Sequence, residues 1–311
     1  MSMTPKQAGI IEPILTTQAR GYSNAEFIGT RLLPIASVRT RNAIVLKFVM
    51  NSFRKRNTRR APGSETMRIE TSFGADPIAL YQESLEGLVP TETEAEAKAI
   101  PGIDMGVEAV REVQDVIQLG RECQIAELVR NQANYDAGHV EVVGTTDKWS
   151  DPASNPLSML NDARSVIRRK TGRKPNTLTI NDDTAMDLCS HPSVLDHYKH
   201  TTGDSVTVEM LARYLKIKEI LVGEAVFLPE NAPDEAEATD VWGDDAILSY
   251  KPEGTNYRVP SFGYTYQLEG FPMAEVPYYE RNRKSWVYPY TEEYRPYING
   301  ADAGFLFKGV R

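Results

Sequence analysis

The chain has 311 residues, of which 41% are hydrophobic and 25% are charged, so it is long enough to bury one extended core or two modest ones. Its formal net charge of −8 argues against a general nucleic-acid-binding protein, which would usually be basic. No stretch approaches the length of an apolar membrane span, and no signal peptide is recognisable at the N-terminus. The two cysteines, Cys123 and Cys189, lie in helical patterns, which argues against a disulfide scaffold and suits a reducing compartment.

Charges are separated along the chain. Residues 31–64 contain no acidic side chain but include the basic residues Arg54, Lys55, Arg56, Arg59 and Arg60. A group of acidic residues follows, namely Glu83, Glu86, Glu92, Glu94 and Glu96, and a second acidic run lies within 230–240. This separation fits either pairing between copies of the chain or two solvated surfaces.

The first 78 residues predict two extended elements. Residues 1–40 lack sustained periodicity and indicate an arm that is poorly ordered unless something ties it down. Strands are predicted at 42–53 and 67–71, so we expect a β-hairpin around the basic loop. A two-stranded hairpin is marginal in water. We therefore expect a neighbouring copy to cover apolar side chains of this hairpin, including Val45, Phe48 and Phe53.

Residues 104–134 are predicted to form a long helix without proline. A helix of this length spans about 45 Å, at 1.5 Å per residue. Its apolar face consists of Val113, Val116, Ile117, Cys123, Ala126, Val129 and Ala133. The same periodicity places Arg111, Asp115, Gln118 and Glu122 on the opposite face.

The remainder mixes helices and strands. A helix is predicted to begin at Pro156, with Asn155 as its N-cap and Gly172 as its terminator. A helix capped by Asn181 is interrupted by Pro192. Another helix is expected at 207–215, and strands are expected at 177–180, 217–222, 226–228, 246–250, 264–268, 286–290 and 305–307. Because this order is not a regular alternation of strand and helix, the predicted class is α+β.

Motifs for catalysis are sparse. His191, His197 and His200 suggest a metal-dependent hydrolase as one alternative, but Pro192 breaks their helical register and no zinc-binding motif accompanies them. Surface histidines are the simpler interpretation. The sequence has no nucleophile elbow and no glycine-rich phosphate loop, so neither catalysis nor a cofactor is expected. The basic run at 54–60 also fits a nucleic-acid-binding module, but aromatic residues for base stacking are sparse there, which favours an acidic neighbouring subunit.

Several strings, in their order and spacing, resemble the major capsid proteins of tailed bacteriophages. The resemblance covers about residues 22–290. The strings are Asn24-Ala25-Glu26-Phe27-Ile28 through Leu32-Leu33-Pro34-Ile35-Ala36-Ser37-Val38, Arg60-Ala61-Pro62-Gly63-Ser64-Glu65, Leu119-Gly120-Arg121-Glu122, Leu211 to Val222 with Gly223-Glu224-Ala225, and Val241-Trp242-Gly243-Asp244.

This resemblance implies the Hong Kong 97-type capsid fold, a structural α+β protein without catalytic residues. The implied parts are an N-terminal arm at 1–40, an extended loop at 41–78, a peripheral domain at 79–178 with a spine helix at about 104–134, an axial domain at 179–264, and C-terminal strands at 265–311 that return to the peripheral domain. An encapsulin-like cellular compartment is the alternative with the same fold.

The resemblance also implies self-assembly into hexamers and pentamers of an icosahedral shell around double-stranded DNA, which the chain binds without sequence specificity. The implied partners are a portal, a scaffolding protein and a decoration protein. The implied location is the virion, with the host cytoplasm as the place of assembly. A chain that begins almost directly with the arm implies a separate scaffolding protein or earlier processing. The residues expected to contact neighbouring subunits are Val45, Phe48, Phe53, Arg54, Lys55, Arg56, Arg59, Arg60, Glu83, Glu86, Glu92 and Glu94.

Overall fold

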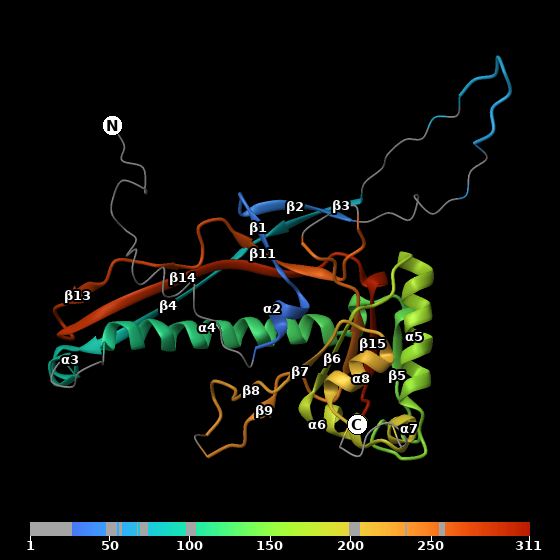
Figure 1. Ribbon diagram of the computed structural model, residues 1–311. Coiled ribbons are helices and arrows are strands. Elements are labelled where there is room, and N and C mark those ends of the chain that lie inside the picture. The colour runs from blue at the N-terminus through green and yellow to red at the C-terminus, as the bar shows by residue number, and fades with distance from the viewer. Residues whose placement is uncertain are drawn as a thin grey trace.

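Two β-sheets and one long helix organise the molecule, as the computed structural model shows (Figure 1). A six-stranded sheet runs along the long helix, and a five-stranded sheet packs with the shorter helices near the end of that helix. This arrangement agrees with the predicted α+β class. The structure describes residues 27–47, 55, 58–66, 68, 74–97, 104–198, 206–233, 235–254 and 259–311.

An antiparallel hairpin is formed by β2 (Asn42–Lys47) and β3 (Gly74–Ala79). The predicted strand at its start is therefore confirmed over β2. Most of the second predicted strand, 67–71, lies outside the described residues, so its pairing stays a prediction, and β2 pairs with the later segment β3. The sequence did not reveal β3 because it contains Asp76 and Pro77, which are both poor strand formers.

The six-stranded sheet is built around one long strand, β14 (Ser285–Ile298). On one edge of β14 lies β4 (Tyr81–Pro90), which pairs with it from Ser285 opposite Pro90 to Tyr294 opposite Tyr81. Its other edge pairs with β11 (Gly263–Leu268), β12 (Met273–Ala274) and β13 (Tyr278–Glu280), and β1 (Ile35–Val38) runs parallel to β11.

The long helix α4 (Met105–Arg130) packs against β4 and β14. Its 26 residues begin at an N-cap, Asp104, whose carboxylate accepts hydrogen bonds from the backbone N–H groups of Gly106 and Val107. The predicted helix is thus confirmed, and it ends four residues earlier than expected. A short helix, α3 (Thr91–Ala97), follows β4.

The predicted faces of α4 are partly wrong. Gln118 and Glu122, expected on the polar face, are 6% and 2% exposed, whereas Val116, expected on the apolar face, is 54% exposed. The reason is that α4 is covered from two directions. The six-stranded sheet covers one side, and a short helix near the N-terminus, α2 (Gly29–Leu32), contacts another.

The five-stranded sheet has the order β5-β15-β10-β6-β7. Its strands are β5 (Val140–Val142), β6 (Thr177–Asn181), β7 (Glu219–Gly223), β10 (Ala246–Ser249) and β15 (Gly304–Lys308). The last strand, β15, therefore shares a sheet with β6, β7 and β10 and does not pair with β14. This observation separates β15 from β14, although the sequence analysis grouped both with the peripheral domain. The division into domains otherwise stays a prediction.

This sheet has a hydrophobic core on each face. Leu248 and Phe307 point to a core with the helices α5 (Pro156–Thr171), α6 (Asp182–Ser190), α7 (Pro192–Tyr198) and α8 (Val208–Leu215). Their neighbours Ile247 and Leu306 point to a second core with the end of α4 and the segment that contains α2. The alternation follows from the two-residue period of a strand.

Helix termini follow the predicted capping residues. Asn155 accepts from the backbone N–H of Ser158, and Asn181 accepts from that of Thr184. Gly172 ends α5 in the left-handed conformation with φ of 68°. These predictions are confirmed. In the described part of the chain, the remaining elements are three 3-10 helices, at Gln132–Asn134, Ala137–His139 and Ala301–Ala303, and a small two-stranded sheet of β8 (Val226–Phe227) and β9 (Thr239–Asp240).

Candidate assembly surfaces

The hairpin offers a different apolar side chain from the one predicted. Val45 is only 2% exposed and shares its face of the hairpin with Ile78, which is also buried, so Val45 is not available to a neighbouring subunit. Ile44 lies on the opposite face and is 72% exposed. The sequence analysis expected Val45 to be exposed to a neighbour, but adjacent side chains of a strand point to opposite faces, so Ile44 is exposed where Val45 is buried. Phe48 and Phe53 lie outside the described residues.

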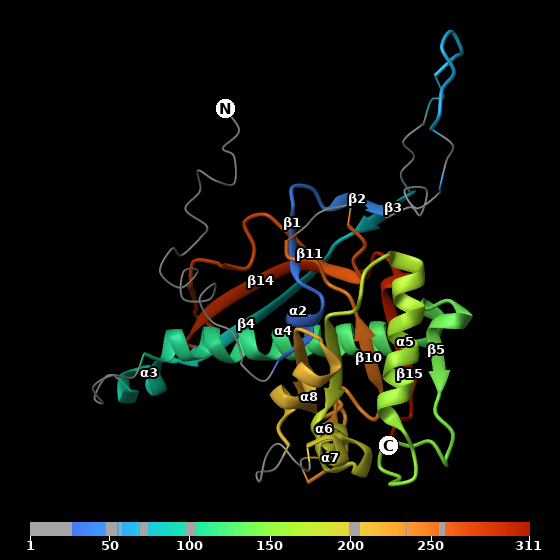
Figure 2. The ribbon, with the colours of Figure 1, turned by 45° about the vertical axis from the view of Figure 1, so that its right-hand side comes forward.

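The described part of the basic loop projects from the body of the molecule (Figures 1 and 2). Lys55, Arg59 and Arg60 are exposed, whereas Arg54 and Arg56 lie outside the described residues. Arg60 Nε donates a hydrogen bond to the backbone carbonyl of Ser64 at 2.7 Å. The loop therefore presents cations far from the two sheets.

The predicted acidic patch is divided among several surfaces. Glu83 faces α4, where its Oε1 accepts from Gln124 Nε2 at 3.3 Å. Glu86 lies on the other face of β4, and its carboxylate accepts from the hydroxyl of Tyr278 at 3.3 Å. Glu92 and Glu94 lie on α3, where Glu92 is exposed and Glu94 is half-buried.

The edge of β4 is a surface that the sequence analysis missed. Among the described residues, β4 pairs only with β14, so its other edge presents unpaired backbone groups. Three large apolar side chains of this strand, Tyr81, Leu85 and Leu88, are 54%, 40% and 44% exposed. A ten-residue edge strand with exposed apolar side chains is a template for association. The apolar residues within 81–90 could have indicated a strand, but the glutamates between them made the segment look like a solvated surface.

A buried carboxylate fastens the N-terminal segment to the body. Glu122 on α4 accepts hydrogen bonds from the backbone N–H groups of Ile28 and Gly29 at 2.8–3.0 Å and from Trp242 Nε1 at 2.9 Å. Burial raises the pKa of Glu122, and these hydrogen bonds oppose the rise. The segment from Ile28 to Leu33 is therefore tied down within its own subunit, which corrects the expectation that all of the arm is extended.

Two further ion pairs join the hairpin and α4 to β14. Arg121 lies 2.7 Å from the buried Glu292, whose carboxylate also accepts from the hydroxyl of Tyr290 at 2.6 Å. Arg41, at the base of the hairpin, donates two hydrogen bonds to the buried Glu293. These contacts fix the hairpin base and the long helix relative to the six-stranded sheet.

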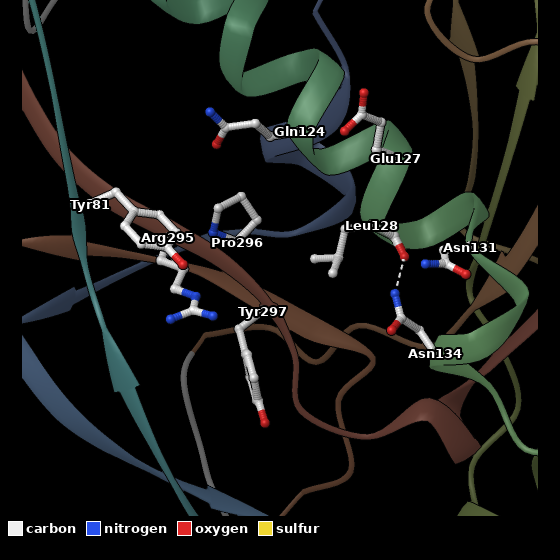
Figure 3. A pocket seen from close by; sticks show the side chains of 9 residues that line it. All are labelled: Tyr81, Gln124, Glu127, Leu128, Asn131, Asn134, Arg295, Pro296 and Tyr297. Carbon is white, nitrogen blue, oxygen red and sulfur yellow. Dashed lines mark hydrogen bonds between the residues drawn. The ribbon is translucent and has the colours of Figure 1, made fainter.

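A pocket of about 520 Å³ lies between the end of α4 and the six-stranded sheet (Figure 3). Arg295 stacks over the ring of Tyr81 at 4.9 Å, and Asn134 donates to the backbone carbonyl of Leu128. The remaining lining residues are Gln124, Glu127, Asn131, Pro296 and Tyr297. This lining has no cysteine, serine, threonine, lysine or histidine.

The candidate metal ligands have other partners. The ring of His191 is 3% exposed, with Nε2 at 3.0 Å from the carbonyl of Asp151 and Nδ1 at 2.7 Å from Ser193 Oγ. His197 Nε2 lies at hydrogen-bond distance, 2.9 Å, from the hydroxyl of Tyr214, and His200 lies outside the described residues. In the described part of the chain, no three potential ligands are grouped to hold a metal, and no helix is both long and apolar enough to cross a bilayer.

Comparison with known proteins identifies the family. The chain is 33% identical over 307 residues to the major capsid protein of Burkholderia phage BcepMu, with 97% of each chain covered. It is 30% identical over 265 residues to the major capsid protein of Pseudomonas phage JBD67, with 84% of this chain and 82% of that one covered. No family model matches the chain.

Similar solved structures support the same assignment to phage capsid proteins. A phage-related protein from Bordetella bronchiseptica RB50 is similar, with a TM-score of 0.81, 32% identity and coverage of 98% of this chain and 99% of that one. The satellite phage P4 procapsid and the SrpI encapsulin of Synechococcus elongatus PCC 7942 share the fold at TM-scores of 0.52 and 0.53. They cover 95% and 92% of this chain and 98% and 88% of their own, at 10% and 11% identity, and show the fold alone.

These findings define a structural protein with the Hong Kong 97-type capsid fold. The chain belongs to the phage major capsid protein family, and it is a structural component of the virion capsid.

Proposed function

We propose that copies of this chain assemble as hexamers and pentamers into an icosahedral shell that encloses packaged double-stranded DNA. Membership of the capsid protein family carries the proposal. Further support comes from the open edge of β4 and from the net charge of −8, which suits a wall that does not bind the genome tightly. We also propose assembly in the host cytoplasm, with a portal, a scaffolding protein and a decoration protein as partners.

Electron microscopy and nuclease protection test this function. The full chain, produced in the phage's host during infection, is expected in closed particles whose double-stranded DNA resists added nuclease. The DNA is expected to show no sequence preference, because the shell contacts only its backbone. Closed shells that hold a host enzyme and no DNA would favour an encapsulin-like compartment instead.

The basic loop supports a contact between neighbouring copies, which we propose as well. In this contact, Arg54, Lys55, Arg56, Arg59 and Arg60 meet the exposed carboxylates of Glu86 on β4 and Glu92 on α3 of the next copy. The exposure of Lys55, Arg59 and Arg60 on a projecting loop supports the basic half, and exposed Glu86 and Glu92 support the acidic half. Because such charges are solvated, the contact sets register more than strength.

Deletion of residues 54–60 tests this contact. The deleted chain is expected to fold, because the described part of the loop lies away from both sheets, but to form no closed particles. The control keeps the loop length and replaces its five basic residues by glutamine. It distinguishes the effect of losing the charges from the effect of shortening the loop. Normal-sized shells from the deletion would refute the assignment of the loop.

We propose, finally, that the chain has no enzymatic activity. The pocket lining without cysteine, serine, threonine or histidine supports this proposal, and so do the hydrogen bonds of His191 and His197. A stoichiometric zinc content in the purified protein, lost together with a hydrolase activity on chelation, would contradict it.

A further inference from the structure

A compact group of basic side chains lies at the C-terminal end of α5 and in the turn that follows. Its five members lie within seven residues and are exposed: Arg168, Arg169, Lys170, Arg173 and Lys174. In the described part of the chain, the only carboxylate paired with this group is Asp302, whose Oδ1 is 3.9 Å from Lys170 Nζ. The helix dipole favours cations here, but cations this close also repel one another. An acidic partner would therefore stabilise the group.

An acidic surface with no internal counter-charge lies on the β8–β9 hairpin. Residues 223–241 contain no lysine or arginine, and Glu230, Glu235, Glu237 and Asp240 are exposed. Among the described strands, β8 and β9 pair only with each other, and an isolated two-stranded hairpin is marginal in water.

The same hairpin also exposes apolar surface. Val226 and Leu228 are 48% and 47% exposed, next to the acidic side chains. Exposed apolar side chains rimmed by charge are typical of a surface that a protein partner covers. Nucleic acid does not fit this hairpin, because its negative backbone would be repelled by the carboxylates.

The basic group and the acidic hairpin lie on different sides of the molecule. β8 follows β7, the strand at one edge of the five-stranded sheet, whereas α5 packs against β10 and β15 toward the other edge. Figure 1 shows the hairpin and α5 on opposite sides of this sheet, and Figure 2 turns α5 toward the viewer. Two complementary surfaces placed this way meet between copies in a head-to-tail ring.

We propose that the β8–β9 hairpin of one copy docks on the basic group at the end of α5 of the next copy. This contact gives a carboxylate partner to Arg168, Arg169, Arg173 and Lys174, which have none within the described part of their own subunit, and covers Val226 and Leu228. It rests on the self-association proposed above and is separate from the contact of the basic loop at 54–60. Complementary charge orients the copies, and salt weakens the contact.

A charge exchange between two variants tests the proposal. One variant carries Arg168→Glu, Arg169→Glu and Arg173→Glu, and the other carries Glu230→Lys, Glu235→Lys and Glu237→Lys. Each variant alone opposes like charges, so its assembled fraction is expected to fall about tenfold or more. A third chain carries all six substitutions and reverses the charge of both surfaces, so opposite charges meet again at every contact, in hexamers and in pentamers alike. Sedimentation velocity and negative-stain microscopy should then show assembly within about twofold of the wild type.

A matched control carries Arg281→Glu, Arg283→Glu and Lys284→Glu in the exposed turn before β14, and it is expected to assemble normally. The proposal is overturned if either three-substitution variant alone assembles like the wild type, if the control loses assembly equally, or if the correctly folded chain with all six substitutions stays unassembled. Circular dichroism establishes their folding. Normal shells of the α5 variant that fail to retain DNA would assign the basic group to DNA instead. A wild-type chain that stays monomeric would overturn self-association itself, which distinguishes the two failures.

Discussion

Glu122 is a buried carboxylate that joins three segments far apart in the sequence. It lies on α4 and receives hydrogen bonds from Ile28, Gly29 and Trp242. The space around it is tight, since a Cβ atom added at Gly29 would lie 2.6 Å from Glu122 Oε2. Helical periodicity predicted that Glu122 lies on the polar, exposed face of α4. It could not reveal that the segment containing Ile28 and Gly29 packs on this face.

Glu122→Ala is expected to lower the free energy of unfolding by about 2–4 kcal/mol, because it leaves buried N–H donors without an acceptor. Chemical denaturation of the dissociated subunit measures this loss. Hydrogen exchange should also show reduced protection of the amides of Ile28 and Gly29. Glu112→Ala, at an exposed position of the same helix, is the control and should change stability by less than about 0.5 kcal/mol.

The raised pKa of Glu122 predicts that its contribution to the free energy of unfolding decreases as the pH rises. Between its ordinary value and the raised value, the folded state holds a proton that the unfolded state has released. The stabilisation associated with this group is therefore complete below the unfolded pKa and is lost as pH rises through the folded pKa. Glu122→Gln removes the titration, so the free energy of unfolding of wild type minus variant should decrease as the pH rises above the ordinary pKa of a glutamate, about 4. An increase would contradict the assignment.

At the scale of elements, α4 supports both the six-stranded sheet and the N-terminal segment. Ile117 is buried in the core between this helix and β14. Ile117→Pro is expected to break the helix at a cost of about 3 kcal/mol or more and to abolish soluble subunit. Circular dichroism and the soluble yield measure the effect. Ile117→Val is the control and should cost about 1 kcal/mol, because it removes a single methylene group.

Elements with strong local signals were predictable, and elements defined by distant pairing were not. The helix that begins at Pro156 carries its own cap and terminator, so its limits agree with the sequence analysis. By contrast, β4 is a strand because β14 pairs with it some 200 positions later in the chain, as Leu85 opposite Tyr290 illustrates. In the sequence, the glutamates of β4 indicated a solvated surface and not a strand. Tertiary pairing overrides such weak local preferences.

The open edge of β4 leads to a separable prediction. Leu85→Lys with Leu88→Lys places charge on exposed side chains, so the dissociated subunit should unfold at nearly its normal denaturant concentration. Association through the edge should be strongly weakened, because lysine side chains on an edge strand are one way in which natural proteins prevent its pairing with another chain. Sedimentation velocity measures the effect. Met186→Lys, at a 66% exposed position on α6, is the control for added charge.

At the scale of the whole molecule, the candidate contacts are spread over segments distant from one another. The basic loop, the edge of β4, the end of α5 and the β8–β9 hairpin each present surface that the described part of the subunit does not cover. The sequence indicated the first of these through its charge. The others depend on which edge or side of a sheet is left open, and that follows from the tertiary arrangement.

Several modest contacts per copy predict that the shell stabilises its own subunits. Neighbouring copies bind the folded state and not the unfolded one, so assembly must raise the midpoint of thermal unfolding. For a chain of this length, each kcal/mol of stabilisation that the contacts give to a subunit raises its midpoint of thermal unfolding by about 2 °C. Scanning calorimetry of assembled particles should therefore give a midpoint at least about 5 °C above that of dissociated subunits. The Leu85→Lys and Leu88→Lys chain should melt like the dissociated wild type at every concentration. Equal midpoints for wild-type particles and subunits would mean that the contacts contribute no net stability, and the shell would then be held together by something other than these surfaces.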